Sequence, residues 1–259
     1  GQATLGIDTR SLATSLSALR TGSKEVVCAK IRMWPVKQGE AGLLQSDAVF
    51  HHTVALPQLN EEMKSENVLH NVSAVGVSEN PRPVQGSYMP CFMAGVSLAT
   101  AFAAALNVPL VRTSHQQGHL AAALFGTQNP ALMQGQNLVF HVSGGTTELL
   151  LCEEYTVLET LGTSLDLYAG QAIDRLGMQL GFAFPAGVEV SDLAAECRED
   201  PDPKISMQGI NCHLSGLQNQ YEALLAEGKD PAYVAKFCLT AIAKTAVAMA
   251  IEARKQSGD

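Results

Sequence analysis

The chain has 259 residues, of which 46% are hydrophobic and 16% charged, a composition that excludes a disordered or fibrous protein and fits packed α/β layers. Its formal net charge of −8 excludes broad electrostatic attraction to nucleic acid, so a local patch or a partner would have to bring any RNA substrate. The six cysteines are far apart and form no C-x-x-C pair, which indicates free thiols in a reducing, cytoplasmic compartment.

The first part of the chain alternates apolar and polar residues and then becomes helical. Residues 3–20 predict a β-hairpin with a polar turn centred on residues 8–11. Residues 26–33 predict a third strand. Residues 46–63 predict a helix, because their apolar positions recur at helical spacing.

The next segment predicts strands on both sides of an apolar helix. Residues 72–78 and 108–112 are short β-rich runs, and residues 92–106 form a helix of small residues. A second helix is expected to begin at Ser114. The longest apolar stretch, residues 93–110, contains polar residues and a proline, so it predicts a buried helix and no membrane association.

The second half repeats the opening pattern. Residues 138–142 and 148–153 predict a second hairpin, and a helix from Ala169 is closed by Gly181. A polar loop at residues 200–208 precedes a helix at residues 233–255. Two hairpins with small polar turns predict two related lobes, residues 1–112 and 113–259. Since α/β alternation would continue with a strand after the last helix, we expect the second lobe to be incomplete at its C-terminus.

The segment S-H-Q-Q-G-H-L contains two histidines four residues apart. Ser114 and Gln117 form a capping box, which places His115 and His119 on the same face of a helix. Two imidazoles at this spacing can share one metal ion, although two solvent-facing or hydrogen-bonded histidines are an equal alternative. His141 is a candidate third ligand, or a core histidine.

The segment V-S-G-G-T-T-E-L predicts either a phosphate-binding turn or a plain glycine hairpin turn. Glycine permits close backbone approach, so amide N–H groups can face phosphate oxygens and neighbouring hydroxyls can assist. The candidate cofactor-binding residues here are Ser143, Gly144, Gly145, Thr146 and Thr147.

Three aspartates are candidates for the ribose or for a phosphate-bound metal. Asp166 and Asp174 flank Gly170 at a helix start, where a nucleotide could dock. The alternatives are that Asp166 caps that helix and Asp174 pairs with a surface arginine. Asp8 is either a turn former or a metal-phosphate ligand.

Four motifs in order, H-x-x-G-H, V-S-G-G-x-T, D-x-x-x-G-x-A-x-D and L-S-G-L at residues 214–217, resemble one family. It is the tRNA threonylcarbamoyladenosine transferase family, also labelled glycoprotease or O-sialoglycoprotein endopeptidase. The resemblance implies an α/β fold of the actin-like ATPase type with two ribonuclease H-like lobes. It also implies transfer of a threonylcarbamoyl group from its adenylate to a tRNA adenosine.

The resemblance also implies cofactors and residue roles. His115 and His119 would bind an iron or zinc ion, and His141 stands where archaeal and eukaryotic members carry a metal-bound tyrosine. The segment of residues 143–147 would face the phosphates of an adenine nucleotide, ATP or threonylcarbamoyl-adenylate, with Mg²⁺ as a further candidate ion. Asp166, Gly170 and Asp174 would hold its ribose side.

The sequence departs from the family pattern at several places. Gln117 replaces a glutamate, Gln171 replaces a glutamate or asparagine, and the family's G-P-G-L loop is changed at residues 86–90. The family's later adenosine segment and final metal-binding aspartate have no counterpart in the sequence. The pattern looks like a divergent paralogous branch found in some Gram-positive bacteria.

Three functions are therefore compared. The first is the transferase, and the second is a non-catalytic paralogue that forms a homodimer or a heterodimer with a related actin-like protein, with tRNA bound through partners. Small-residue helices such as residues 92–106 suit such close packing. The third is a metallopeptidase, which the amide of Gln117 disfavours because it cannot act as the base beside a metal-bound water.

Overall fold

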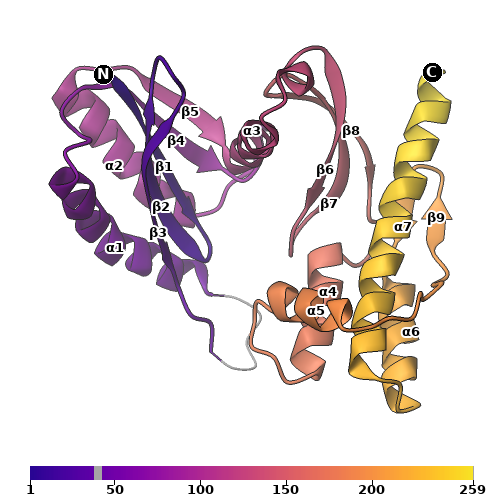
Figure 1. Cartoon of the computed structure of the whole chain (residues 1–259). Helices are drawn as coiled ribbons and strands as arrows, with labels where there is room; N and C mark the ends of the chain where they lie inside the picture. The colour runs from indigo at the N-terminus through magenta and orange to yellow at the C-terminus, as the bar shows by residue number, and fades with distance from the viewer. Residues whose placement is uncertain (38–42, 259) are drawn as a thin grey trace. The chain divides into compact units, whose positions relative to one another are not determined.

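The computed structural model describes residues 1–37 and 43–258, and the chain divides into two compact units, Gly1–Thr127 and Gln128–Asp259. Each unit has its own sheet and its own apolar core (Figure 1). The predicted lobe boundary at residues 112/113 lies before helix α3 (His115–Thr127), which contacts strands of the first unit and is grouped with it.

The first unit contains a five-stranded mixed sheet in the order β3-β2-β1-β4-β5. Neighbours β1–β2 and β2–β3 are antiparallel, whereas β1–β4 and β4–β5 are parallel. This is the strand order of a ribonuclease H-like lobe, so the predicted actin-like α/β fold is confirmed. The strands are β1 (Ala3–Arg10), β2 (Ala13–Arg20), β3 (Val26–Met33), β4 (Val72–Asn80) and β5 (Leu110–Ser114).

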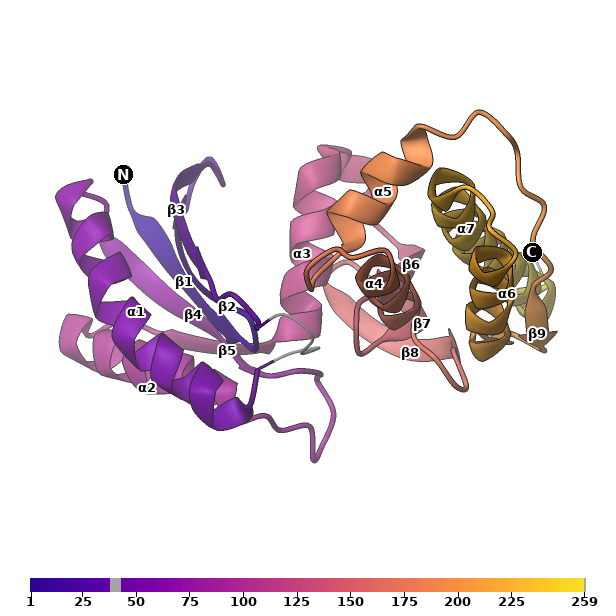
Figure 2. The same ribbon diagram turned by 90° about the horizontal axis from the view of Figure 1, so that it is seen from below.

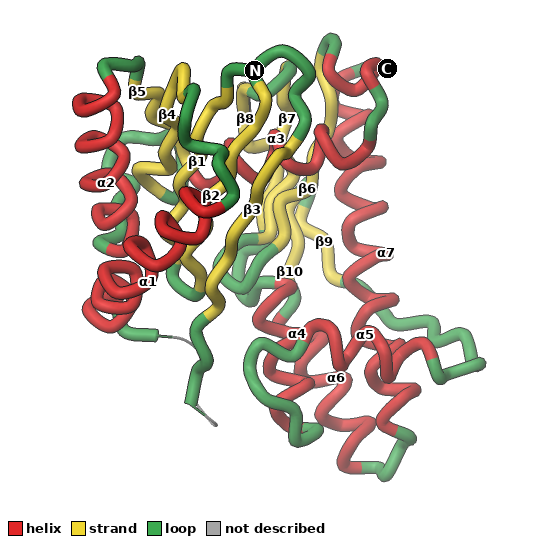
Figure 3. The backbone as a smooth tube through the Cα atoms, turned by 60° about the vertical axis from the view of Figure 1, so that its left-hand side comes forward, coloured by secondary structure: helices red, strands yellow, loops and turns green. Residues whose placement is uncertain are grey.

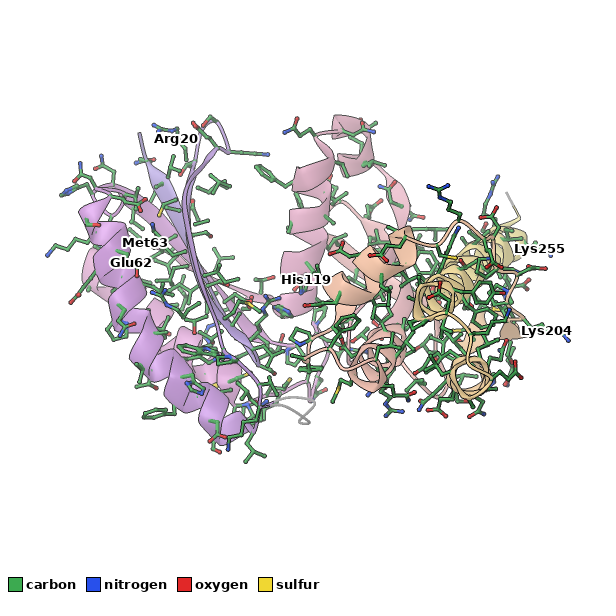
Figure 4. The ribbon with its side chains drawn as sticks, turned by 60° about the horizontal axis from the view of Figure 1, so that its bottom comes forward. Arg20, Glu62, Met63, His119, Lys204 and Lys255 are labelled. Atoms are coloured by element: carbon green, nitrogen blue, oxygen red, sulfur yellow. The ribbon has the colours of Figure 1, made fainter. Side chains whose placement is uncertain are left out.

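Helices α1 (Gln45–Ser65) and α2 (Cys91–Leu106) lie together on one face of this sheet (Figure 2). Alternate residues of β1 point into the core, which buries Leu5 and Ile7. Met63 of α1 is fully buried against the same cluster (Figure 4). The opposite residues of β1, including Asp8, therefore face away from this core.

The second unit contains a three-stranded antiparallel sheet and a group of helices, shown in red beside it in Figure 3. Its core contains buried side chains from helices and strands of this unit, including Leu149, Leu176, Tyr221 and Met249. The elements are η1 (Pro130–Met133), β6 (Gln136–Val142), β7 (Thr147–Glu153), β8 (Thr156–Thr163), α4 (Ala169–Gln179), α5 (Gly187–Ala195), β9 (Ser206–Gln208), β10 (Asn211–His213), α6 (Ser215–Ala226) and α7 (Pro231–Ser257).

Helix α7 is, within the described ranges, the one helix long and apolar enough to cross a membrane by length and composition. Its buried side chains, among them Val234, Cys238 and Met249, belong to the core of the second unit. The apolar stretch singled out from the sequence corresponds to α2, which is shorter.

Most elements predicted from periodicity are confirmed, and the third strand begins and ends at the predicted residues. The predicted position of the first turn, centred on residues 8–11, was wrong. Asp8 lies inside β1 opposite Ser15, and the strands pair as far as Arg10 and Ala13, so Ser11 and Leu12 make the turn. The sequence analysis missed β8, α5, β10 and α6, and residues 206–208 form β9 at the end of the predicted polar loop.

The buried ring of His52 makes the stability of the first unit depend on pH. Its Nδ1 lies 2.6 Å from the hydroxyl of Thr14, and burial lowers the pKa of the imidazole. An unfolded histidine takes up a proton near pH 6.5, whereas the native ring resists it. The free energy of unfolding is therefore expected to fall between pH 7 and pH 5, by at most about 1.4 kcal/mol per pH unit for this residue.

Chemical denaturation of the variant His52→Asn at a series of pH values tests this, and the variant should show a shallower slope than the wild type. The exposed His70 provides the control, because His70→Asn should keep the wild-type slope. An identical slope in all three proteins would show that His52 does not resist protonation.

Candidate functional site

Helix α3 begins at His115 because the residue before it and a residue of its first turn cap each other. The Oγ of Ser114 accepts the N–H of Gln117 at 3.1 Å, and the Oε1 of Gln117 accepts the N–H of Ser114 at 3.1 Å. The predicted capping box is therefore confirmed. It holds the first turn so that His115 and His119 share one face of the helix.

The two imidazoles converge as the spacing predicted. Their Nε2 atoms are 2.7 Å apart, and the ring planes are nearly perpendicular, at 81°. Figure 4 shows His119 on α3 with its side chain directed toward the strands of the first unit. At this distance the contact is a hydrogen bond in which one ring nitrogen carries the proton.

Asp8 fixes the orientation of the first imidazole. Its Oδ1 lies 3.1 Å from the Nδ1 of His115. Burial raises the pKa of Asp8, but the hydrogen bond and charge of His115 and the hydroxyl of Ser78 outweigh it, so the pKa is held below its usual value. The carboxylate therefore accepts the Nδ1–H of His115, and the lone pair of Nε2 points toward His119.

A hollow of about 260 Å³ lies at this cluster. Burial, followed by the charges of His115 and Arg10, lowers the pKa of His119, which keeps this ring neutral at neutral pH. A neutral imidazole has the lone pair that metal binding requires. The lining residues are Asp8, Arg10, Ser15, Ser78, His115, Gly118 and His119.

The cluster fits part of a metal site. Imidazole nitrogens suit zinc and iron, and a ligating histidine usually donates its other ring N–H to a carboxylate, as His115 does to Asp8. Two nitrogens on one tetrahedral zinc lie roughly 3.3 Å apart, so the observed pair needs only a small ring movement. Among the described residues no group of three or more His, Cys, Asp or Glu side chains is arranged to hold a metal ion, so a complete site would need ligands besides this pair.

His141 lies in the second unit, on β6. It pairs across the ladder with Glu148, and its Nδ1 is 3.9 Å from the Oε2 of that residue. The buried carboxyl of Glu148 gives the ring a local neighbour. Its role as a third ligand beside His115 and His119 remains a prediction.

The glycine turn of the second unit lies against the start of α4. The N–H of Gly170 donates to the carbonyl of Ser143 at 3.1 Å, and the N–H of Ala169 donates to the hydroxyl of Thr147 at 2.8 Å. A Cβ on Gly170 would lie 2.4 Å from the carbonyl carbon of Ser143, so only glycine allows this approach. The structure thus brings residues 143–147 and Gly170 together.

Gly144 and Gly145 have no such internal reason to be glycine. Neither has a positive φ, and a Cβ on either would meet no described atom within 4 Å. The turn is closed below them by the N–H of Ser143, which donates to the carbonyl of Thr146 at 2.8 Å. The two exposed glycines leave open backbone beside a helix N-terminus, which is the arrangement that phosphate-binding turns use.

Asp166 connects two distant segments of the second unit. Its Oδ1 accepts the N–H groups of Leu167 at 2.6 Å, Leu214 at 2.7 Å and Ser215 at 3.2 Å, and its Oδ2 accepts the hydroxyl of Ser215. Burial alone would raise its pKa, but these hydrogen bonds lower it to about 2. The carboxylate therefore caps α6 rather than α4, which explains the L-S-G-L motif structurally. Its contact with a ribose stays a prediction.

Asp174 connects α4 to the loop before α5. Its Oδ1 accepts the N–H of Ala186 at 2.9 Å, and burial raises its pKa. The alternative prediction was a surface ion pair between Asp174 and a nearby arginine. The neighbouring Arg175 instead donates to Gln218 at 3.0 Å. Its part in nucleotide binding also stays a prediction.

The model of the family described as tRNA N6-adenosine threonylcarbamoyltransferase matches residues 34–257. The chain belongs to this family. A tRNA N6-adenosine threonylcarbamoyltransferase of Listeria innocua is 28% identical over 265 residues, covering 98% of this chain and 74% of the relative. One of Carboxydothermus hydrogenoformans is 27% identical over 221 residues, covering 84% of this chain and 64% of the relative. The chain thus spans about two thirds of that relative's length.

Solved structures with similar chain paths have low sequence identity. YeaZ from Pseudomonas aeruginosa has a TM-score of 0.38 and 13% identity, covering 90% of this chain and 98% of that one. The ethanolamine utilization protein EutJ from Carboxydothermus hydrogenoformans has a TM-score of 0.39 and 14% identity, covering 91% and 88%. At these values the likeness carries no argument about function.

The departures of this chain from the family pattern keep the local structure. Gln117 supplies the capping oxygen on α3, and the Oε1 of Gln171 accepts the N–H of Tyr168 at 3.3 Å at the start of α4. At position 117 glutamine retains the acceptor of a glutamate and loses its negative charge.

The sequence analysis missed Arg10, Ser15 and Ser78, which also line the hollow. The alternation of β1 from Asp8 was the signal for Arg10, because alternate residues of a strand share a face. No comparable local signal identified Ser78, which reaches the hollow through the pairing of β4 with β1.

The variant Asp166→Ala is expected to lose about 1 kcal/mol of unfolding free energy at pH 7, because its pKa of about 2 lies below that of an unfolded aspartate and solvent screens this exposed residue. This contribution is present above about pH 4 and is lost as the pH falls through the native pKa. Urea denaturation at pH 7 measures it. The exposed Asp192 on α5 is the matched control, and Asp192→Ala should change stability by less than about 0.5 kcal/mol. Equal effects would contradict the proposed connection between the segments.

The variant Gly170→Ala is expected to destabilise the second unit by about 1–3 kcal/mol, because its Cβ would overlap backbone atoms of Ser143 and Gly144. Gly144→Ala, with open space at its Cβ, should leave the thermal midpoint nearly unchanged. Thermal denaturation of the two variants compares them directly. A Gly170→Ala protein as stable as Gly144→Ala would show that α4 does not need this close approach.

Proposed function

We propose that the chain is a metal- and adenine-nucleotide-binding protein of the transferase type, which acts in transferring a threonylcarbamoyl group from its adenylate to an adenosine of tRNA. The observation that carries this proposal is the hydrogen-bonded series of Asp8, His115 and His119 in one hollow. Membership of the tRNA N6-adenosine threonylcarbamoyltransferase family supports it.

In this proposal His115 and His119 would hold an iron or zinc ion through their Nε2 atoms, after the proton that His119 shares with His115 moves to the Nδ1 of His119. Asp8 keeps the proton of His115 on Nδ1, so the nitrogen facing the ion is unprotonated. When bound, the ion supplies a Lewis acid that polarises a phosphate or carbonyl oxygen of the acyl-adenylate. The protein itself orients the reactants and removes them from water.

The second unit is proposed to bind the nucleotide, as Mg²⁺-ATP or as threonylcarbamoyl-adenylate. The exposed backbone of Gly144 would present its N–H group, and the N-terminus of α4 a favourable helix dipole, to phosphate oxygens, while the N–H of Gly145 donates to the hydroxyl of Ser143. Ser143 supplies a hydroxyl beside them, and Asp174, with its raised pKa, lies one helix turn further on.

The metallopeptidase alternative is weakened by the contacts of Gln117. Besides the backbone of Ser114, its Oε1 accepts the hydroxyls of Thr113 at 3.1 Å and Ser114 at 3.0 Å. An amide oxygen held in a helix cap cannot take a proton from a metal-bound water.

A non-catalytic role is the second candidate, favoured by the loss of charge at Gln117 and by the changed residue at Gln171. In it the chain is a cytoplasmic partner that forms a homodimer, or a heterodimer with a related actin-like protein. The net charge of −8 supports the proposal that partners, rather than this chain, supply most of the contact with tRNA.

Metal analysis of the purified chain after loading with Zn²⁺ or Fe²⁺ tests the first proposal. We expect one ion per chain in the wild type and loss of stoichiometric binding in His115→Ala and in His119→Ala. Asp8→Asn should weaken binding about ten- to hundredfold, because the orienting carboxylate is lost. The exposed His70 is the control, and His70→Ala should bind like the wild type.

A wild-type chain that binds no ion, or variants that keep it, would contradict the metal site. If the ion is bound, a single-turnover transfer from threonylcarbamoyl-adenylate to tRNA, with and without a related actin-like partner, separates the transferase from the non-catalytic role.

A further inference from the structure

Arg10 lies beside the histidine pair and has no part in the roles described so far. It is the last residue of β1, two positions after Asp8 on the same face, and it lines the same hollow. Arg10 pairs with Ala13 across the hairpin, next to the turn at Ser11 and Leu12. The hairpin thus places a guanidinium at the edge of the proposed metal site.

The guanidinium of Arg10 lacks the partner that other arginines of this unit have. Arg20, Arg32 and Arg112 form ion pairs with Glu25 at 3.5 Å, Glu62 at 2.7 Å and Glu79 at 3.2 Å. Among the described residues no carboxylate forms such a pair with Arg10. Its buried Nε has no hydrogen-bond partner, and its Nη2 has a weak contact with the sulfur of Met33 at 3.8 Å.

A half-buried guanidinium without a partner costs free energy, because it loses water and gains no acceptor. Asp8, whose pKa the charge of Arg10 helps to lower, forms no ion pair with Arg10 and is already engaged by His115 and Ser78. The positive charge of Arg10 is felt in the hollow, where it helps to lower the pKa of His119. An anion is therefore the ligand that would complete this surface.

The other donors of the hollow favour a tetrahedral anion. The hydroxyls of Ser15 and Ser78 come from β2 and β4, on either side of the strand that carries Arg10. A guanidinium binds two oxygens of a phosphate in one plane, and hydroxyls outside that plane suit the remaining oxygens. A hollow of about 260 Å³ has room for such a group and several waters, since a water takes about 30 Å³.

We propose that Arg10 binds a phosphoryl oxyanion in this hollow, beside His115 and His119. The proposal rests on the proposed function for the class of the natural ligand, which would be a phosphorylated substrate. The binding itself depends on residues of the first unit and needs no metal.

Isothermal titration calorimetry of pyrophosphate into the chelator-treated full chain at low salt tests the proposal. Arg10→Gln should weaken binding at least about tenfold, the loss expected for a charge-assisted hydrogen-bonded pair. Arg10→Lys should recover part of the affinity, because it keeps the charge without the planar fork. Arg20→Gln removes the same charge at the other end of the hairpin (Figure 4) and should bind within about twofold of the wild type.

Malonate serves as a planar carboxylate probe and should bind more weakly than pyrophosphate. The proposal is overturned if the wild type does not bind pyrophosphate, if Arg10→Gln binds it unchanged, if Arg20→Gln loses as much, or if malonate binds equally well. Thermal midpoints of the variants confirm that each is folded.

Metal analysis of the same proteins distinguishes a failure of the oxyanion site from a failure of the proposed metal site. Arg10→Gln should retain the metal of the wild type, whereas His115→Ala should lose it. A chain that binds pyrophosphate through Arg10 and never binds metal would contradict the metal site and leave the oxyanion site standing.

Discussion

The hydrogen bond between Asp8 and His115 joins residues that are 107 positions apart, and the proposed chemistry of the first unit depends on it. It sets which nitrogen of His115 carries a proton, and so directs the other nitrogen toward His119. It requires the pairing of β1 with β4 and of β4 with β5, because β5 leads directly into the helix that carries both histidines. The strand order of the first unit's sheet therefore brings Asp8 and His115 together.

Each unit holds the start of one helix with hydrogen bonds from its own residues. In the first, Ser114 and Gln117 hold the start of α3 at the end of a strand. In the second, Thr147 caps the start of α4, and Gly170 allows the helix to lie against the turn. In both units, polar side chains accept hydrogen bonds from the free N–H groups of a helix start, and these hydrogen bonds fix where the helix begins.

The departures from the family pattern change charge more than shape. Gln117 preserves the cap of α3 and removes a negative charge there, and Gln171 preserves the cap of α4. The loss of a carboxylate at Gln117 makes the surroundings of His115 and His119 less favourable to a cation. A site of this kind would depend more on a bound phosphate, and less on acidic side chains, to hold a metal ion.

The sequence alone determined the features that depend on neighbouring residues: strand alternation in β1, the capping box of α3, the spacing of His115 and His119, and the order of the motifs that defined the family. Tertiary structure decided which distant groups meet. It placed Asp8 in a strand beside His115, gave Asp166 its partners at Leu214 and Ser215, and left Arg10 without a carboxylate among the described residues. Local patterns follow from the geometry of one helix or strand, whereas these contacts depend on strand register and packing between segments far apart in the chain.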